Sequence, residues 1–213
     1  MRITGERIYL KPFQIADANQ KLAFHLANKT FFEGYSMERD DRFYTIEEQQ
    51  SLISRLEDFA ASDVEYYYGI FLHDTDELIG TINLFSILRE SLQSAFIGYF
   101  LDKEHNGNGY ATEAVELIVD FGFDILGLHR IEAGVMPKNE RSKQVLLKAG
   151  FHLEGLAVQN VRINGNWEDH QVLAIINPGE LKKAKCRSPC TWLFLFLTSV
   201  PIFPVTDGII FIK

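Results

Sequence analysis

Two glycines stand between a strand pattern and a helix pattern near the middle of the chain. In Leu101-Asp-Lys-Glu-His-Asn-Gly-Asn-Gly-Tyr-Ala-Thr-Glu-Ala114 the strand ends, Gly107 and Gly109 form a turn, and a helix begins. Glycine allows the backbone to approach a bound group closely, and the free N–H groups and dipole of a helix start favour an anion. The segment therefore predicts a pyrophosphate cradle, although an ordinary tight turn has the same pattern. No Gly-Lys-Ser/Thr and no third glycine follow, which argues against nucleotide-hydrolysing and NAD-linked enzymes.

A second strand-to-helix junction follows about 30 residues later, in Val135-Met-Pro-Lys-Asn-Glu-Arg-Ser142. Asn139 is well placed to cap the helix, and its amide could equally satisfy the amide groups of a pantetheine chain. Ser142 lies on the first helical turn, either in the site or simply in solvent.

The two junctions together resemble the acetyl-CoA motifs of the GNAT superfamily of N-acetyltransferases. The matching segments are Gly107-Asn-Gly-Tyr-Ala-Thr-Glu-Ala114, Asn139-Glu-Arg-Ser142, and Lys148-Ala-Gly-Phe151 followed by Glu154-Gly155. The resemblance extends over residues 5 to 176. The opening Glu6-Arg-Ile-Tyr-Leu-Lys-Pro-Phe13 with Asp17, and the hairpin Asn164-Gly-x-Trp-x-Asp-His170, are similar to the branch that acetylates the N-terminal alanine or serine of ribosomal proteins.

The resemblance implies which residues bind acetyl-CoA. The strand edge at Leu101 would pair with the pantetheine arm and polarise the thioester carbonyl, Asn139 would hold the arm, and Ser142 would lie near the sulfur. The pyrophosphate would bind the backbone of Asn106, Gly107, Asn108, Gly109, Tyr110, Ala111 and Thr112.

Glu104 departs from the family pattern, which often has Gln or Arg at this place. Its carboxylate would repel phosphate, so we expect it to face solvent. The balancing positive charge would then come from Lys103, Lys138 or Lys143.

Acetyl transfer to an amine requires a neutral amine, a stabilised oxyanion and a proton for the departing thiolate. We expect direct attack, because residues 1–178 contain no cysteine to act as a nucleophile. The candidate catalytic residues are Ser142, Glu154 and Asp169. Glu168 and His170 are further candidates for the base, and Tyr68 and Tyr99 could line the acceptor site. Each of the charged candidates could instead be a surface residue of the hairpin, and each tyrosine could belong to the core.

The resemblance implies transfer of an acetyl group to a primary amine, with the N-terminal α-amine of a ribosomal protein as the first candidate. A polyamine or another small amine is the alternative, and a non-catalytic acetyl-CoA-binding module is a third. The acidic stretch from Glu33 to Asp41 adjoins Phe31, Phe32 and Tyr35, and it could recognise a cationic acceptor or be a solvated loop. A homodimer is left open.

Composition narrows the class of protein. The 213 residues carry a formal charge of −8 and a pI of about 5.3, which argues against a nucleic-acid-binding surface and equally serves solubility. The cysteines are Cys186 and Cys190, which imply no disulfide framework; a C-x-x-x-C pair without a second Cys/His pair is a weak metal signal and two spare thiols are favoured, so no metal is expected. Residues 1–10 do not resemble a signal peptide, so we expect a cytoplasmic protein without a membrane partner.

The strand and helix patterns predict one domain over residues 1–178. It would be an α/β (α+β) fold, with a mixed, mostly antiparallel sheet of about seven strands and helices on both faces. Strands are predicted at 7–13, 66–72, 78–85, 94–101, 130–135, 151–159 and 167–175. Helices are predicted at 17–28, 45–60, 110–126 and 141–149, with Asp17 and the pair Thr45 and Glu48 as caps.

Residues 179–213 differ in kind from the rest. A basic cluster is followed from Trp192 by an apolar stretch that contains Pro201, Pro204, Asp207 and Gly208. These four residues disfavour a membrane-spanning helix, which needs about 20 apolar residues in succession. A tail that derives from a shifted or read-through reading frame, or an extension found in particular strains, is the favoured interpretation.

Overall fold

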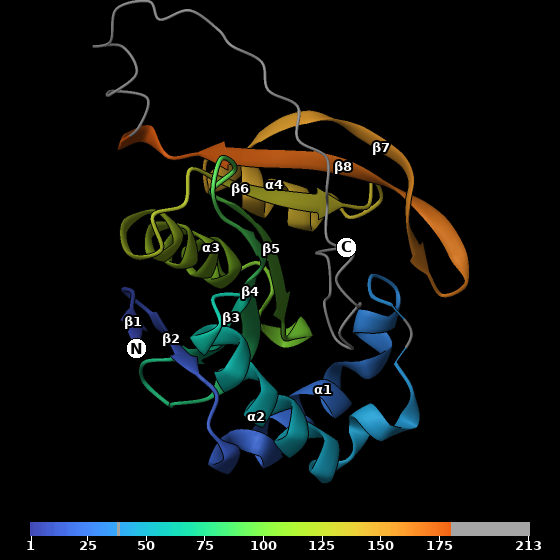
Figure 1. Cartoon of the computed structure of the whole chain (residues 1–213). Helices are drawn as coiled ribbons and strands as arrows, with labels where there is room; N and C mark the ends of the chain where they lie inside the picture. The colour runs from blue at the N-terminus through green and yellow to red at the C-terminus, as the bar shows by residue number, and fades with distance from the viewer. Residues whose placement is uncertain (38, 180–213) are drawn as a thin grey trace, which may run out of the picture.

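The computed structural model describes residues 1–37 and 39–179, and these form a single mixed sheet between two layers of helices (Figure 1). The strand order is β1-β2-β3-β4-β5-β6-β8-β7. Only β5 and β6 run parallel among the neighbouring pairs. The strands are β1 (Ile3–Thr4), β2 (Ile8–Pro12), β3 (Glu65–Leu72), β4 (Leu78–Leu88), β5 (Ser94–Leu101), β6 (Arg130–Val135), β7 (His152–Ile163) and β8 (Asn166–Ile176).

The four α-helices cover both faces of the sheet, as the sequence predicts. They are α1 (Ala18–Glu33), α2 (Ile46–Ala61), α3 (Tyr110–Asp120) and α4 (Glu140–Lys148). In Figure 1, α1 and α2 lie on one side of the sheet and α3 and α4 on the other. Each layer buries its own apolar cluster, one centred on Ile82, Ile97 and Val115, the other on Phe13, Phe24 and Phe71. The α/β class is confirmed, with the two-residue strand β1 added, which is too short to produce a detectable alternation.

Helix α1 begins after Asp17 at the predicted N-cap position, but it differs from the prediction in the role of the Asp17 side chain and in where it ends. Asp17 closes a short 3-10 turn, and its carboxylate accepts hydrogen bonds from Lys11 Nζ and Gln14 N instead of capping α1. The helix also continues five residues past Asn28, because the buried Asn28 amide bonds to Phe24 O within the helix and to the Asp102 carboxylate just after β5. These tertiary bonds outweigh the usual preference of asparagine for helix ends.

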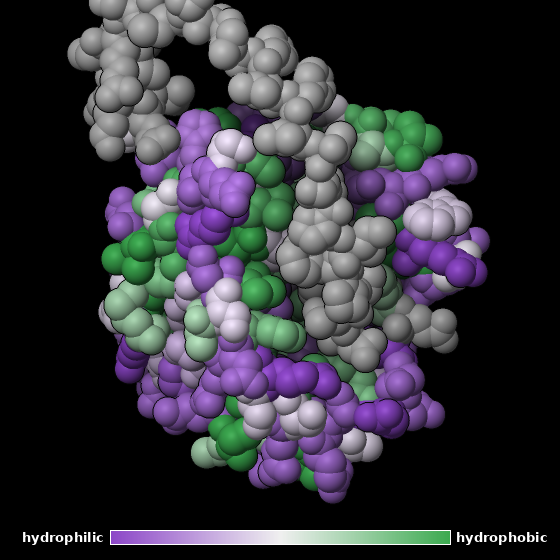
Figure 2. All heavy atoms as spheres, viewed as in Figure 1, coloured by the Kyte–Doolittle hydropathy of each residue, from purple (hydrophilic) through white to green (hydrophobic). Residues whose placement is uncertain are grey.

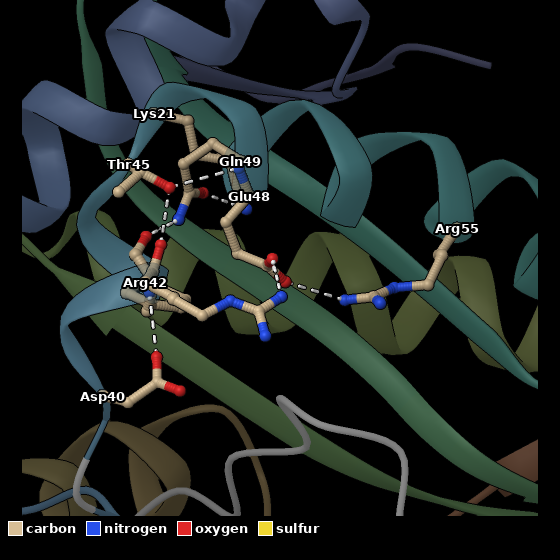
Figure 3. A network of polar contacts seen from close by, with 8 residues as sticks. Lys21, Asp40, Arg42, Thr45, Glu48, Gln49 and Arg55 are labelled. Carbon is tan, nitrogen blue, oxygen red and sulfur yellow. Dashed lines mark hydrogen bonds and ion pairs between the residues drawn. The ribbon is translucent and has the colours of Figure 1, made fainter.

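Helix α2 begins as predicted at Thr45, whose Oγ1 accepts from Glu48 N at 3.4 Å (Figure 3). The Glu48 carboxylate does not complete a reciprocal capping box. It pairs instead with Arg42 and Arg55, at 3.1 and 3.3 Å. Helix α3 ends at Asp120, and the next five residues, Phe121–Ile125, form a π-helical turn where the pattern predicts a continuous α-helix.

The β7–β8 hairpin has the turn that its sequence predicts. Asn164 and Gly165 take φ values of 47° and 82°, the left-handed conformation that a two-residue hairpin turn requires. The tip contacts α1, because Asn164 Nδ2 donates to Glu33 O at 2.7 Å. Strand β7 is the sheet edge and exposes Leu156 and Val158, and hydrophobic side chains gather at this end of the molecule in Figure 2.

Strands β5 and β6 pair over three residues only, from Ser94 with Arg130 to Phe96 with Glu132. Beyond this point both strands continue, to Leu101 and Val135, but within the described residues they form no further pairs with one another. The sheet therefore contains an internal gap that opens toward the carboxyl ends of β5 and β6.

In the described part of the chain, no helix is both long and apolar enough to cross a membrane. The segment 180–213, which includes the basic cluster, both cysteines and the apolar stretch, lies outside the described residues.

Candidate active site

The gap between β5 and β6 continues into a cleft with two connected parts. The first part, about 580 Å³, lies between the start of α3 and the start of α4. The second part, about 100 Å³, lies between β5, the start of α4 and the end of α1. Leu101, Asn106, Ala111, Arg141 and Val145 line both parts, so they form one continuous channel.

The first part of the cleft contains the glycine turn. Gly107 and Gly109 have φ values of 85° and 84°, and Gly109 is the N-cap of α3 without any side-chain cap. The first backbone N–H to bond back into the helix is that of Glu113, which donates to Gly109 O. The preceding N–H groups of the first turn lie beside the cleft, where Ala111 and Thr112 belong to its wall.

An ion pair far apart in the sequence fixes the start of α3 against β2. The Glu113 carboxylate accepts from Arg7 N at 2.8 Å and Arg7 Nε at 3.0 Å, and Arg7 Nη1 donates to Asn108 O at 2.7 Å. Burial raises the pKa of Glu113, but the hydrogen bonds from Arg7 and Ile8 outweigh it, so the pKa lies below its ordinary value. Arg7 thus holds both the glycine turn and the helix that follows.

The asparagine of the turn, Asn106, is also used to hold the loop. Its Nδ2 donates to Asp102 O at 3.0 Å, while the Asp102 carboxylate accepts from Asn28 Nδ2 and Glu104 N. The Glu104 side chain is exposed, as expected.

Positive charge lines the first part of the cleft, mainly from residues that the sequence analysis did not select. Lys103, Arg141 and Lys148 contribute to the wall. Lys138 and Lys143 form ion pairs with Glu168 and Glu140 and do not line either part. Arg141 lies on the first turn of α4 and Lys148 on its last turn. Both could have been recognised as candidates to balance the phosphate charge once α4 was assigned.

A pair of hydroxyl groups lies in the second part of the cleft. Ser142 Oγ and Tyr99 OH are 2.9 Å apart, and Tyr99 OH also lies 3.1 Å from Ser142 O. Burial raises the pKa of Tyr99 more than the Ser142 hydrogen bond lowers it, so the phenol stays protonated at neutral pH. Asn139 Oδ1 accepts from Ser142 N at 3.2 Å, which makes Asn139 the α4 cap and orients Ser142.

The remaining sequence candidates are dispersed. Glu154 pairs with Arg130, and this hydrogen bond lowers its pKa to about 2. Asp169 Oδ1 accepts from Gln159 N at the β7 bulge. Neither carboxylate lines the two parts of the cleft. Glu168 pairs with Lys138, and Tyr68 is buried in the core, whereas Tyr99 lines the cleft. His170 Nδ1 lies 3.1 Å from Glu168 O on β8.

No group of three or more His, Cys, Asp or Glu side chains in the described ranges is arranged to hold a metal ion.

Comparison with known proteins shows which families and structures this chain is similar to. Residues 7–152 match the family model "Acetyltransferase (GNAT) domain". The chain is 54% identical over 178 residues to the probable N-acetyltransferase YjcK of Bacillus subtilis, covering 84% of this chain and 98% of that protein. The solved ribosomal-protein-S5-alanine acetyltransferase of Vibrio fischeri superposes with a TM-score of 0.79 at 29% identity, over 84% of this chain and 97% of that one. Mycobacterium smegmatis RimJ, solved with CoA-disulfide, superposes with a TM-score of 0.79 at 30% identity, over 85% and 89% of the two chains.

Proposed function

The chain belongs to the GNAT acetyltransferase family, and from this premise we propose that it transfers the acetyl group of acetyl-CoA to the N-terminal α-amine of a protein, with ribosomal proteins as the first acceptors to test. One observation carries the proposal. A single channel leads from the uncapped, glycine-bounded start of α3 to the Ser142–Tyr99 hydroxyl pair beside the gap in the sheet.

The chemistry of the channel fits the two ends of CoA. Phosphate groups would bind the N–H groups that follow Gly109, with Lys103, Arg141 and Lys148 to balance their charge. The pantetheine amides would pair with the strand edge of β5 beyond Phe96, which has no strand partner on this side among the described residues. A relative at 30% identity is solved with a CoA disulfide, which supports the same ligand here.

The Ser142–Tyr99 pair would serve the departing sulfur. Formation of the C–N bond and cleavage of the C–S bond leave a thiolate, which needs a proton or a strong hydrogen bond. Tyr99 is neutral and Ser142 is buried at the first turn of α4, where the helix dipole favours negative charge. The protein otherwise contributes position and electrostatics, since the thioester supplies the reactive acyl group.

The second part of the channel supports an extended, narrow acceptor. Phe31, Phe32 and Tyr35 from the end of α1 form its wall, and the hairpin tip meets α1 at Glu33. The contact between Asn164 and Glu33 joins the hairpin to the end of α1 near this wall, and a narrow aromatic space of this kind suits an acceptor that enters as a chain end. The ribosomal-protein-S5-alanine acetyltransferase of Vibrio fischeri, at 29% identity, supports a ribosomal protein as the acceptor.

An acceptor screen with acetyl-CoA and detection of free thiol tests the proposal. N-terminal peptides of ribosomal proteins that begin with Ala or Ser should be the preferred acceptors, and the same peptides with a blocked α-amine are the matched controls. Preferred turnover of spermidine would show the polyamine alternative. Binding of acetyl-CoA without turnover of any amine would show a non-catalytic module.

A further inference from the structure

A buried carboxylate on β3 lies on the acceptor face of the sheet, and a row of residues on β4 and β5 leads from it to the gap. On β3, β4 and β5, the residues Tyr67, Asn83 and Gly98 are aligned directly across the strands. They face α1 and α2, because the alternate residues Tyr68, Ile82 and Ile97 belong to the core under α3. Gly98 is two residues past the last β5–β6 pair and places no side chain between Asn83 and the gap.

Glu65 extends this row. Asn83 Nδ2 donates to Glu65 Oε1 at 2.6 Å, and Glu65 is only 6% exposed. The other oxygen, Oε2, accepts no hydrogen bond from a described residue. It is also absent from the set of fully buried side-chain atoms that lack a partner, so Oε2 is not sealed off. The Asn83 amide therefore fixes the carboxyl group and leaves Oε2 available.

A lysine on the neighbouring helix completes the cluster. Lys21 of α1 is 3% exposed, and its Nζ donates to Gln49 Oε1 at 2.8 Å, as Figure 3 shows. Among the described residues Lys21 makes no ion pair with Glu65 within 4.0 Å. Burial of two ionisable groups without direct pairing is costly, so a purely structural role explains the cluster poorly.

We propose that Glu65, oriented by Asn83, is the base that takes a proton from the acceptor ammonium group as it lies over Gly98, an inference that rests on the proposed acetyl transfer. One proton passes from the ammonium nitrogen to Glu65 Oε2 and then to solvent. The neutral nitrogen forms the C–N bond as the C–S bond breaks. The second proton leaves the nitrogen and is taken up by the thiolate, so the products are an amide, a free thiol and one released proton.

The electrostatics around Glu65 agree with this role. Burial raises its pKa to about 7, against the lowering effects of the Asn83 hydrogen bond and the Lys21 charge. Burial also lowers the pKa of Lys21 to about 7, with Arg39 and Arg55 lowering it further and the Glu65 charge opposing them. Tyr67, on the same strand as Glu65, stays neutral because burial raises its pKa. An N-terminal α-amine, with an ordinary pKa of about 7.7–8.0, is matched to such a base far better than a lysine at about 10.4.

The test compares Glu65→Gln with Glu132→Gln. Glu132 lies on the same face at the last β5–β6 pair, but it is held by Arg130 at 2.7 Å. We expect kcat with an N-terminal peptide to fall about 10²-fold or more in Glu65→Gln and to change little in Glu132→Gln. Acetyl-CoA affinity, measured by calorimetry, should stay the same in both, which also establishes that each variant folds.

Two signatures separate a base from a merely structural residue. The wild-type kcat/KM should rise as pH increases through about 7, because the ionised carboxylate is the active form. In Glu65→Gln the rise should move to the pKa of the acceptor α-amine, about 7.7–8.0, because only the amine that is already neutral can react. With 2,2,2-trifluoroethylamine, which is already neutral near pH 7, the loss caused by Glu65→Gln should shrink at least tenfold relative to the peptide.

An equal loss of kcat in both variants, or the same loss with both amines, would overturn the assignment. Infrared difference spectra of the wild type and Glu65→Gln provide a readout that needs no acceptor. A Glu65 carboxyl group that is fully ionised at about pH 5.5 would overturn the proposal even if no substrate were found. If only a polyamine is acetylated, the proposed peptide acceptor is wrong. The role of Glu65 is then tested by comparing Glu65→Gln with Glu132→Gln with the polyamine as the acceptor.

Discussion

At the scale of single residues, Gly109 shows how closely backbone conformation and ligand access are linked. Its φ is 84°, and a Cβ at this position would lie 3.2 Å from Arg7 Nη2. We expect Gly109→Val to abolish acetyl-CoA binding in calorimetry, because the valine would displace the turn that faces the phosphates and would strain the backbone.

Gly127→Val is the matched control for this experiment. Gly127 also has a positive φ of 66°, but a Cβ there meets nothing within 4 Å. It should carry the same backbone strain, about 1–2 kcal/mol, and keep its affinity for acetyl-CoA. If folded Gly109→Val keeps its affinity for acetyl-CoA, the assignment of the phosphate site to the start of α3 is wrong.

The Ser142–Tyr99 pair is the second prediction at this scale. Ser142→Ala should lower kcat and kcat/KM together by at least about tenfold with little change in acetyl-CoA affinity, since the hydroxyl acts on charge that develops only in the transition state. Tyr99→Phe should do the same. The double variant should lose less than the product of the two single losses, because the hydroxyls are 2.9 Å apart and act as one unit. If Ser142→Ala keeps the wild-type turnover, Ser142 has no role in the chemical step and is only a residue of the first helical turn.

At the scale of elements, the Arg7–Glu113 contact joins β2 to α3. The Glu113 carboxylate is 13% exposed and accepts from two backbone N–H groups and the guanidinium. Glu113→Gln should destabilise the protein by about 1–3 kcal/mol near pH 7 in urea unfolding. Since the folded pKa of Glu113 lies below 4.5, this contribution is present above pH 4.5 and is lost as the pH falls through the folded pKa. The difference between wild type and Glu113→Gln should therefore shrink in acid. A constant difference down to about pH 3 would contradict the ion-pair explanation.

Elements with strong local chemistry were predictable from the sequence. Strand β6 has the predicted bounds, and the Asn164-Gly165 turn follows from two residues that tolerate positive φ. The end of α1 was not predictable, because the contact of Asn28 with Asp102, 74 residues away, keeps an apparent cap residue inside the helix.

The same distinction applies to the candidate site. The glycine turn and Asn139 can be recognised because their properties are local to the backbone. Glu65 could not be recognised, since its burial depends on tertiary contacts with Asn83 on β4 and with the helix layer of α1 and α2. A carboxylate at the start of an apolar strand is the only local signal.

At the scale of the whole molecule, we propose that residues 1–178 form the folding unit. The last strand within the described residues, β8, ends at Ile176 and is enclosed between β6 and β7. Deletion of residues 181–213 should leave acetyl-CoA affinity and the unfolding midpoint unchanged, and should increase solubility by removing the apolar stretch that begins at Trp192.

A longer deletion, of residues 173–213, is the control, because it removes Leu173 and Ala174 from the buried part of β8 and should prevent folding. Loss of folding in the shorter deletion would show that the tail belongs to the core. Solubility of the full chain only in detergent would support the membrane-anchor alternative.

The short pairing of β5 with β6 also bears on how the protein withstands heat. Three residue pairs join the half of the sheet that contains β1 to β5 with the half that contains β6 to β8. In the proposed complex, the pantetheine arm binds in the gap between β5 and β6 as an additional strand would. Bound acetyl-CoA therefore strengthens the connection between the two halves of the sheet. A ligand present at a hundredfold excess over its Kd stabilises the folded state by about 2.7 kcal/mol. Backbone amides along Ile97–Leu101 should then exchange with solvent more slowly as acetyl-CoA increases, and a destabilising mutation should be tolerated better at a high acetyl-CoA concentration than at a low one.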